Sequence, residues 1–451
     1  MSLRGILLAL WIFPSLPICL FRPFYGIILW TIISFTSVQW YTFSAYSLPW
    51  AMVVAIPTIV GSFLFGRGWR NVLSVQGSLM VVLWMWFTVT TLVAVDTPIL
   101  ADNAEWTWFR WGFVTKVILM TIIAVAVIDS FERLQTLVRV IAVCFGIFVV
   151  KCLPFLIFQG GEDRVYGPEK SMIADNNDFG LALNMTVPIF FFLAQSETRP
   201  WVKRLFWFLT VATVPAIFFT YSRGALVGLV AITGVMFLQL KRRGILVPLF
   251  LVAVSIAVLM APDKWKSRMD PTRQDAMDGS AYSRINAWTF SWRLALDYPV
   301  TGGGFDTFTK ELFVRYAPVA RDVHGPHSIY FGVLAEHGFP GLALYLTFVT
   351  SVLVALRRLV RWARMRGDDL VANYANMFFI SLVGFMISGF FLGRQYFDYM
   401  FTIVACVIVL KSAATARWAA QDREDEPPPE EGTDITTDVP ASADGEAVAQ
   451  W

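Results

Sequence analysis

Charged residues are scarce in this chain of 451 amino acids: they make up 15% of it, whereas a soluble domain has about 25%. Hydrophobic residues account for 57%, and the mean hydropathy is +0.60. This composition excludes an ordinary soluble protein and predicts an integral membrane protein with many spans, in contact with membrane lipids. The net charge is only +3, and we expect no nucleic-acid partner.

Cysteine and the common catalytic motifs are also rare. The four cysteines all fall in apolar runs, so they predict neither a disulfide framework nor a metal cluster. The sequence contains no P-loop, no HExxH and no GxSxG pattern, and no internal repeat is apparent. The run Asp175–Asp178 (DNND) is a weak candidate for a metal or nucleotide-sugar site. We therefore expect no metal ion and no cofactor.

Apolar runs of membrane-spanning length are what the chain has in abundance. A helix needs about 20 apolar residues to cross a bilayer. The first two runs are short and interrupted by proline, so one of them can be re-entrant, and we predict about twelve transmembrane helices in an all-α fold. The thirteen runs are 5–20, 24–41, 48–66, 73–95, 107–128, 136–158, 179–195, 203–220, 224–240, 244–260, 328–355, 371–392 and 396–412.

Basic residues in the short connections predict the orientation of these spans. Clusters at 67–70, 241–243 and 357–366 fall on one side when the spans are counted, and lysine and arginine in short loops mark the cytoplasmic side. The opposite, outer side then receives a loop at 160–178 and a much longer one at 261–326. A connection of that length is usually functional or separately folded, and we expect short helices lying over the membrane.

These features divide the chain into four predicted parts. They are N-terminal transmembrane helices (1–260), a large periplasmic loop (261–326), C-terminal transmembrane helices (327–412) and a disordered, acidic cytoplasmic tail (413–451).

All three histidines fall between His324 and Gly341, where the large loop re-enters the membrane. His327 follows Gly325-Pro326 at the predicted start of a helix, and a neutral imidazole there can accept a proton from a hydroxyl group. The alternative is an interfacial histidine that only caps or packs. His337 lies deeper, and we interpret it as a local partner of Glu336, whereas His324 can be a surface residue.

Two arginines lie on the same predicted side as His327. Arg223 stands in the turn Ser222-Arg223-Gly224, and Arg284 stands in a helical pattern that ends before Pro299 and is followed by three glycines. Arginine binds phosphate through a planar, always-charged fork. The alternatives are snorkelling to the interface for Arg223 and a salt bridge with a nearby aspartate for Arg284. The glycines predict a flexible turn that can wrap a ligand or another loop.

A carboxylate also enters an apolar span near the outer side. Asp398 lies in the last run, with Arg394 one turn earlier as a potential partner. Together, two arginines, a histidine and several carboxylates on one face suit an anionic leaving group such as pyrophosphate and a base for a hydroxyl acceptor. No ATP is present outside an inner membrane, so the donor should arrive already activated, as a lipid-linked pyrophosphate sugar does.

Three elements in order resemble the bacterial O-antigen ligase superfamily. They are Ser222-Arg223-Gly224, the pattern Ser283-Arg284…Trp288…Pro299…Gly302-x-Gly304, and His327-Ser328 followed by Gly338-Phe339-Pro340-Gly341. They cover the core from about 175 to 345, while the flanking regions agree only in being apolar spans.

The resemblance implies a GT-C-like, metal-independent, inverting glycosyltransferase of the inner membrane with its active site on the periplasmic face. It implies undecaprenyl-pyrophosphate-linked glycan as the donor and a sugar hydroxyl of lipid A–core as the acceptor in lipopolysaccharide biosynthesis. His327 then falls on the family's proposed general base, and Arg223 and Arg284 on the proposed pyrophosphate binders. Asp398 is a looser match as a substrate-binding residue.

Two alternatives stay open at this point. The superfamily also contains O-antigen polymerases and protein O-glycosylation ligases, including a group associated with exosortase systems that the N-terminal spans somewhat resemble. A transporter of lipid-linked sugars belongs to a different class. Its polar residues should line both halves near the midplane, with repeated broken helices.

Overall fold

Helices and turns make up the described part of the chain, with no strand among those residues. The computed structural model describes residues 3–42, 48–158, 162–239, 262–269 and 274–424. The α-helices are α1 (Leu3–Ile12), α2 (Leu16–Phe21), α3 (Pro23–Thr36), α4 (Trp50–Phe65), α5 (Trp69–Val72), α6 (Val75–Asp96), α7 (Ala104–Val127), α8 (Phe131–Phe158), α9 (Asn176–Ser196), α10 (Pro200–Phe218), α11 (Arg223–Gln239), α13 (Asp263–Met269), α14 (Gln274–Asp297), α15 (Lys310–Tyr316), α16 (Ile329–Met365), α17 (Asp369–Gly389) and α18 (Asp398–Glu424).

The predicted polytopic membrane fold is confirmed. Within the described residues, nine helical stretches are long and apolar enough to cross a membrane, and three shorter apolar helices accompany them. The predicted runs coincide with these helices, except the run 244–260, which lies outside the described residues. The count of twelve crossings therefore stays a prediction. Residues 1–414 form one compact unit, and residues 415–451 are a second unit.

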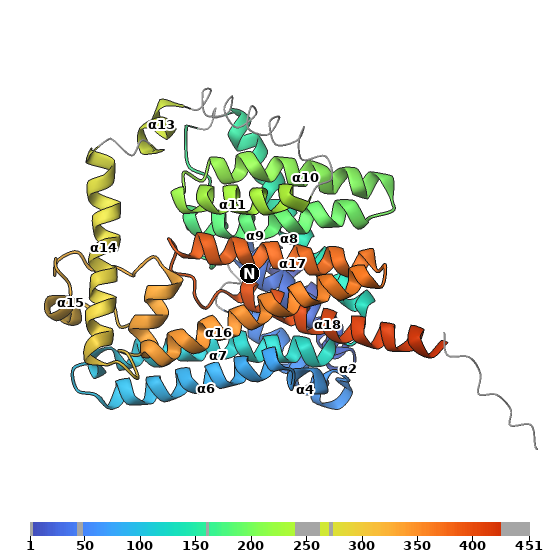
Figure 1. Ribbon diagram of the computed structural model, residues 1–451, viewed down its shortest axis with the longest axis horizontal. Coiled ribbons are helices and arrows are strands. Elements are labelled where there is room, and N and C mark those ends of the chain that lie inside the picture. Colours follow the sequence, from blue (N-terminus) through green and yellow to red (C-terminus); the bar gives the residue numbers. More distant parts are fainter. Residues whose placement is uncertain (1–2, 43–47, 159–161, 240–261, 270–273, 425–451) are drawn as a thin grey trace, which may run out of the picture. The chain divides into compact units, whose positions relative to one another are not determined.

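Helix α9 lies at the centre of the first unit, with almost its entire length buried among neighbouring helices. It packs against α8, α10, α11 and α17, and α16 packs against α6 and α17 (Figure 1). The amide of Asn184 on α9 donates to the carbonyl of Ala225 (2.7 Å) and to the hydroxyl of Ser388 (3.1 Å). Interhelical hydrogen bonds of this kind join α9, α11 and α17 where no water can compete.

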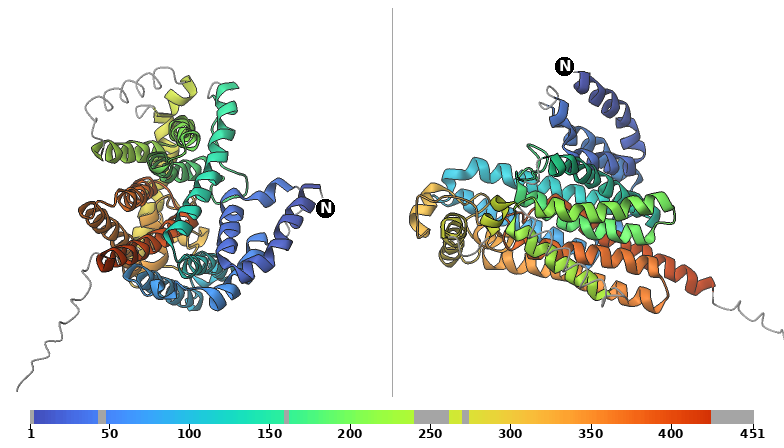
Figure 2. Two further views of the ribbon diagram at one scale, coloured as in Figure 1. Left: turned by 90° about the vertical axis from the view of Figure 1, so that its right-hand side faces the viewer. Right: turned by 90° about the horizontal axis from the view of Figure 1, so that it is seen from above.

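The first four helices form a group of their own at one edge of this bundle (Figure 2). Their small core contains Ile12, Ile33 and Trp50, all buried. Helix α3 connects the group to the rest through contacts with α7 and α8.

One end of the bundle is covered by α14, which crosses the ends of the helices at the place where α11 and α16 begin (Figure 1). We call this the loop end. The predicted short helices of the large loop include α13 and α15, but α14 is 24 residues long, because its helical pattern continues unbroken up to Tyr298-Pro299. Its last residue, Asp297, confirms the predicted stop before the proline.

Helix α16 is broken where it leaves the loop end. Gly338 has φ 68° and ψ −172°, and Pro340 follows. A proline has no N–H for the carbonyl four residues earlier, so the carbonyl of Glu336 needs another donor. The N–H groups of Gly303 and Gly304 supply hydrogen bonds to the carbonyls of Ala335 (2.8 Å) and Glu336 (2.9 Å). The glycine turn therefore packs around the break in α16. The prediction was that this turn surrounds either a ligand or another segment of the chain, and here it surrounds another segment.

Candidate functional site

His327 lies at the loop end, immediately before α16. The helix begins at Ile329, so His327 precedes it by two residues and is not part of its first turn. Its backbone is left-handed, with φ 43°, which is uncommon for a residue other than glycine or asparagine. Part of the side chain reaches solvent on this face, while neighbouring segments surround the rest. The segment at Gly393 runs beside it, since a Cβ on Gly393 would lie 3.7 Å from the Cα of His327.

Helix α14 fixes the segment that carries His327. The indole N–H of Trp288 donates to the carbonyl of Pro326 (2.7 Å), and the indole stacks on Phe331 with centroids 5.0 Å apart. Two residues earlier, Asn286 accepts from the N–H of Val319 (2.8 Å) and donates to that residue's carbonyl (2.9 Å). These bonds hold both ends of the stretch 319–326 against α14. They set the position of the imidazole from two sides.

The electrostatic surroundings keep His327 neutral. Neighbouring segments exclude water from part of the His327 ring and lower its pKa, and the positive charge of Arg284 lowers this pKa further. His324 lies near, with ring centroids 6.2 Å apart, and bonds to Asp322 (3.2 Å). A neutral imidazole at neutral pH is the form that accepts a proton.

Arg223 and Arg284 come together from two different elements. Arg223 is the first residue of α11, after a turn in which Tyr221 has φ 58° and the hydroxyl of Ser222 accepts from the N–H of Ala225 (3.2 Å). Burial lowers the pKa of Arg284, and the nearby charge of Arg223 lowers it further. The two positive charges repel each other, so an anion bound by both guanidinium groups would be favourable.

Among the side chains that the structure describes, Arg284 forms no ion pair, and its Nε is buried without a hydrogen-bond partner. The alternative interpretation, a salt bridge with a nearby aspartate, stays a prediction, because Asp270, Asp275 and Asp278 lie outside the described side chains. A buried donor without a partner costs free energy until a ligand or water satisfies it. This guanidinium is therefore ready for an anionic ligand.

A third arginine at the loop end was missed as a site residue. Arg394, in the segment between α17 and α18, forms an ion pair with Asp178 in the first turn of α9. Burial is the largest single effect and works against the charge, but the bond to Asp178 and the negative charges of Asp178, Asp175 and Asp398 together raise the pKa of Arg394. Its charge also acts on His327. The sequence did single out both residues, but the ion pair connects positions 216 residues apart and no local spacing indicates it.

The structure does not bring Asp398 together with the other three predicted residues. It is 6% exposed and accepts a hydrogen bond from the hydroxyl of Ser34 on α3 (2.7 Å). Arg394, its potential partner, forms an ion pair with Asp178 instead; among the described residues no ion pair joins Arg394 to Asp398, although the two charges act on each other.

The interpretation of His337 as a local partner of Glu336 needs correction. The imidazole is fully buried and bonds to the hydroxyl groups of Thr90 and Tyr396, each at 2.7 Å. The carboxylate of Glu336 accepts from Tyr396 (2.6 Å) and Gln395 (3.1 Å). Adjacent side chains on a helix point about 100° apart, so the two groups meet only through Tyr396. His337 belongs to a buried polar network below the exposed site.

Within the described residues no group of three or more His, Cys, Asp or Glu side chains could hold a metal ion. The cations at the loop end include Arg223, Arg284 and Arg394, and guanidinium groups suit a phosphate-bearing ligand.

Comparison with known families matches two segments of the chain. Residues 205–346 match the family described as "O-Antigen ligase", and this segment contains Arg223, Arg284 and His327. Residues 3–198 match a "Family of unknown function (DUF5935)". A search of curated proteins finds no match. The resemblance to the O-antigen ligase superfamily is thus confirmed over the segment that carries the three motif residues.

Proposed function

We propose that this chain is an O-antigen ligase of the bacterial inner membrane, a metal-independent, inverting glycosyltransferase with its active site on the periplasmic face. It would transfer a glycan from undecaprenyl pyrophosphate to a hydroxyl group of lipid A–core. The family match supports the coarser statement, a ligase- or polymerase-type role in glycan assembly. The finer statement is supported by the occurrence of Arg223, Arg284 and His327 in the matched segment and by the electrostatic effect of Arg223 on Arg284 and of Arg284 on His327.

The two arginines bind the leaving group in this mechanism. As the bond between the anomeric carbon and the phosphate oxygen breaks, negative charge develops on the pyrophosphate. Arg284 and Arg223 would stabilise that charge through hydrogen bonds that strengthen in the transition state. The unpartnered Nε of Arg284 supports this role, because it supplies a donor that is already desolvated.

His327 acts on the acceptor. Its neutral imidazole would take the proton of the acceptor hydroxyl as that oxygen attacks the anomeric carbon from the face opposite the pyrophosphate. The electron pair of the broken bond stays on the pyrophosphate. The configuration of the anomeric carbon is inverted in this single displacement. Arg394 and Asp178 lie beside this reaction centre. A substrate contact by Asp398 would require its bond to Ser34 to open.

The test uses purified protein, undecaprenyl-pyrophosphate glycan and lipid A–core, with EDTA and without nucleotide. We expect glycan transfer, and a loss of about 10²- to 10⁴-fold in His327→Asn, which removes the base. Asparagine tolerates a left-handed backbone, so it separates chemistry from strain. The control is Arg321→Ala, an exposed residue of the same loop that should leave transfer unchanged.

Product identity separates the remaining acceptors. A polymerase would lengthen the glycan on its lipid carrier, and a protein ligase would modify a serine or threonine, both with the same donor and the same residues. A transporter would move the donor across the bilayer without breaking its pyrophosphate bond. Full transfer by His327→Asn would overturn the role of the histidine, and an intact donor with every acceptor would overturn the enzyme itself.

A further inference from the structure

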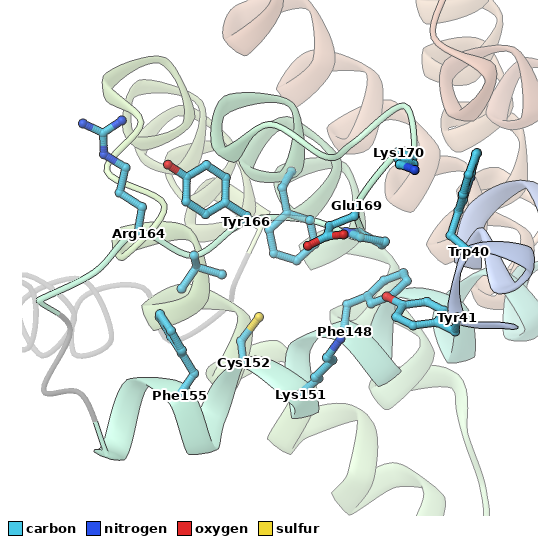
Figure 3. Close-up of a pocket in the computed structure, with 14 residues that line it drawn as sticks. Trp40, Tyr41, Phe148, Lys151, Cys152, Phe155, Arg164, Tyr166, Glu169 and Lys170 are labelled. Atoms are coloured by element: carbon cyan, nitrogen blue, oxygen red, sulfur yellow. The ribbon is translucent and has the colours of Figure 1, made fainter. Parts of the chain in front are cut away.

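A cation-lined cavity lies between the 3-10 turn Val38–Thr42, the last turns of α8 and the segment 164–170 (Figure 3). It has a volume of about 620 Å³. Ligand-binding pockets have volumes of about 300–1,000 Å³. The cavity is therefore large enough for a lipid headgroup or a sugar.

The walls of the cavity combine positive charge with apolar surface. Lys151, Arg164 and Lys170 supply three cations against one carboxylate, that of Glu169. The apolar part of the lining comes from Phe148, Cys152, Phe155 and Phe179. A cavity lined by both cations and aromatic rings fits an anionic amphiphile, which has a charged head and an apolar chain.

Aromatic rings hold two of the lysines at the edge of this cavity. The ammonium of Lys151 lies 5.0 Å from the ring centre of Tyr41, and that of Lys170 lies 4.6 Å from the ring centre of Trp40. Such contacts are typical of lysines that reach toward a membrane interface, where tryptophan and tyrosine also gather. Snorkelling alone explains the lysines but does not produce a cavity of this size between them.

The cavity also lies beside a surface of α8 that would contact membrane lipid. On α8, apolar side chains on either side of Lys151 are exposed, among them Ile147 (55%) and Phe158 (86%). In a membrane-spanning helix such side chains face acyl chains. The cavity therefore lies beside surface that would contact acyl chains, and the long lysine stems can extend their charges toward the lipid phosphates.

One wall of the cavity is shared with the reaction site. The segment that carries Arg164 and Lys170 is attached to the turn before Arg223, since the N–H of Val165 donates to the carbonyl of Phe219 (2.9 Å). Further along, Asn176 donates to the carbonyl of Thr220 (2.7 Å). A phosphate held in the cavity would lie on the other side of this segment from the arginines.

We propose that the cavity between the turn Val38–Thr42, α8 and the segment 164–170 binds the phosphate headgroup of a lipid, with Lys151 and Lys170 as its main charge contacts and Glu169 opposing them. Two sources share this chemistry: a polyprenyl phosphate carrier and a glycerophospholipid of the bilayer. The proposal concerns binding alone and does not depend on the transfer reaction.

The test is saturation binding of radiolabelled undecaprenyl phosphate and of phosphatidylglycerol to detergent-purified protein. Arg223→Ala and Arg284→Ala are combined in the background, so that the other anion site does not contribute. We expect Lys151→Met and Lys170→Met each to weaken binding about fivefold, because a basic residue near an anionic lipid surface contributes about that factor. Methionine keeps an unbranched stem of similar length, and Lys310→Met on exposed α15 is the matched control.

Glu169→Gln should change the affinity for lipid phosphate in the opposite direction. Removing the carboxylate should strengthen phosphate binding, which a variant that merely damages the fold cannot do. Preference for undecaprenyl phosphate would identify the carrier as the ligand, and preference for phosphatidylglycerol would identify a bilayer lipid. Equal binding of uncharged undecaprenol, or unchanged binding in both methionine variants, would overturn the proposal.

Discussion

The hydroxyl of Tyr396 lies 2.7 Å from Nε2 of His337, and neither side chain has appreciable access to solvent. The same hydroxyl donates to Glu336. One oxygen thus satisfies two buried polar groups beside the break in α16. This network connects α6, through Thr90, with the segment between α17 and α18. It supports the part of the chain from which His327 emerges.

Removal of this oxygen should destabilise the protein. In Tyr396→Phe, Glu336 and His337 each lose a hydrogen bond without gaining water, at a cost of about 1–3 kcal/mol in the free energy of unfolding. Thermal unfolding in detergent micelles measures the effect. Tyr25→Phe is the control, because the tyrosine is 56% exposed and should tolerate the change. Equal melting temperatures for both variants would show that the network contributes little.

Arg284→Lys should keep part of the activity that Arg284→Ala loses. Truncation to alanine removes a donor to the leaving group, and we expect kcat to fall by about 10²- to 10³-fold. Lysine retains the charge but not the planar fork, so its loss should be smaller. Initial rates of glycan transfer over a range of donor concentrations separate kcat from KM. A pure KM effect in both variants would assign Arg284 to ground-state binding only.

The pH dependence of transfer should report His327. The base acts when neutral, so kcat/KM should rise with pH through the pKa of His327, which burial and then Arg284 place below its usual value near 6.5. Removal of the cation in Arg284→Gln favours the protonated imidazole, so the acidic limb should move to higher pH. Burial remains, so the shift is partial. An acidic limb that stays in place would exclude electrostatic coupling of the two residues.

The ion pair between Asp178 and Arg394 should show coupling in a double-mutant cycle. Asp178→Asn alone leaves a largely buried guanidinium without its partner, and we expect a loss of about 3 kcal/mol in the free energy of unfolding. Arg394→Gln in the same chain should recover part of this loss, since both charges are then gone. Unfolding of the four proteins in detergent gives the coupling energy. Additive effects would mean that the two side chains act independently.

Gly302→Ala should displace the glycine turn from α16. The residue has φ 63°, and a Cβ there would lie 2.6 Å from the carbonyl oxygen of Ala335. Backbone strain of this kind costs about 1–3 kcal/mol. We expect lower stability together with reduced transfer, both measured against Gly112→Ala, where a Cβ meets nothing within 4 Å. A fully active and stable Gly302→Ala would show that the turn can move aside.

Local patterns in the sequence predicted the helices well and the site only in part. The run 179–195 became α9 (Asn176–Ser196), because length and apolarity alone specify a span. Such local patterns could not predict the partners of the charged residues. Asp398 bonds to Ser34, 364 residues away, and Arg394 to Asp178, whereas the sequence offered only the neighbour one turn away. Contacts of this range depend on which helices pack together, and hydropathy does not encode that choice.

The break in α16 also has a mechanical consequence. A 37-residue helix would be about 55 Å long, well beyond the hydrocarbon thickness of about 30 Å. The part after Pro340 can span the bilayer alone, which leaves the part before Gly338 as a lever of about 15 Å that ends at His327. A rotation of about 10° at the pivot would carry the imidazole about 2.6 Å, and misplacement by about 1 Å can already cost two orders of magnitude in rate. The hydrogen bonds from Gly303 and Gly304 act at this pivot, so they restrict the rotation that would displace the imidazole.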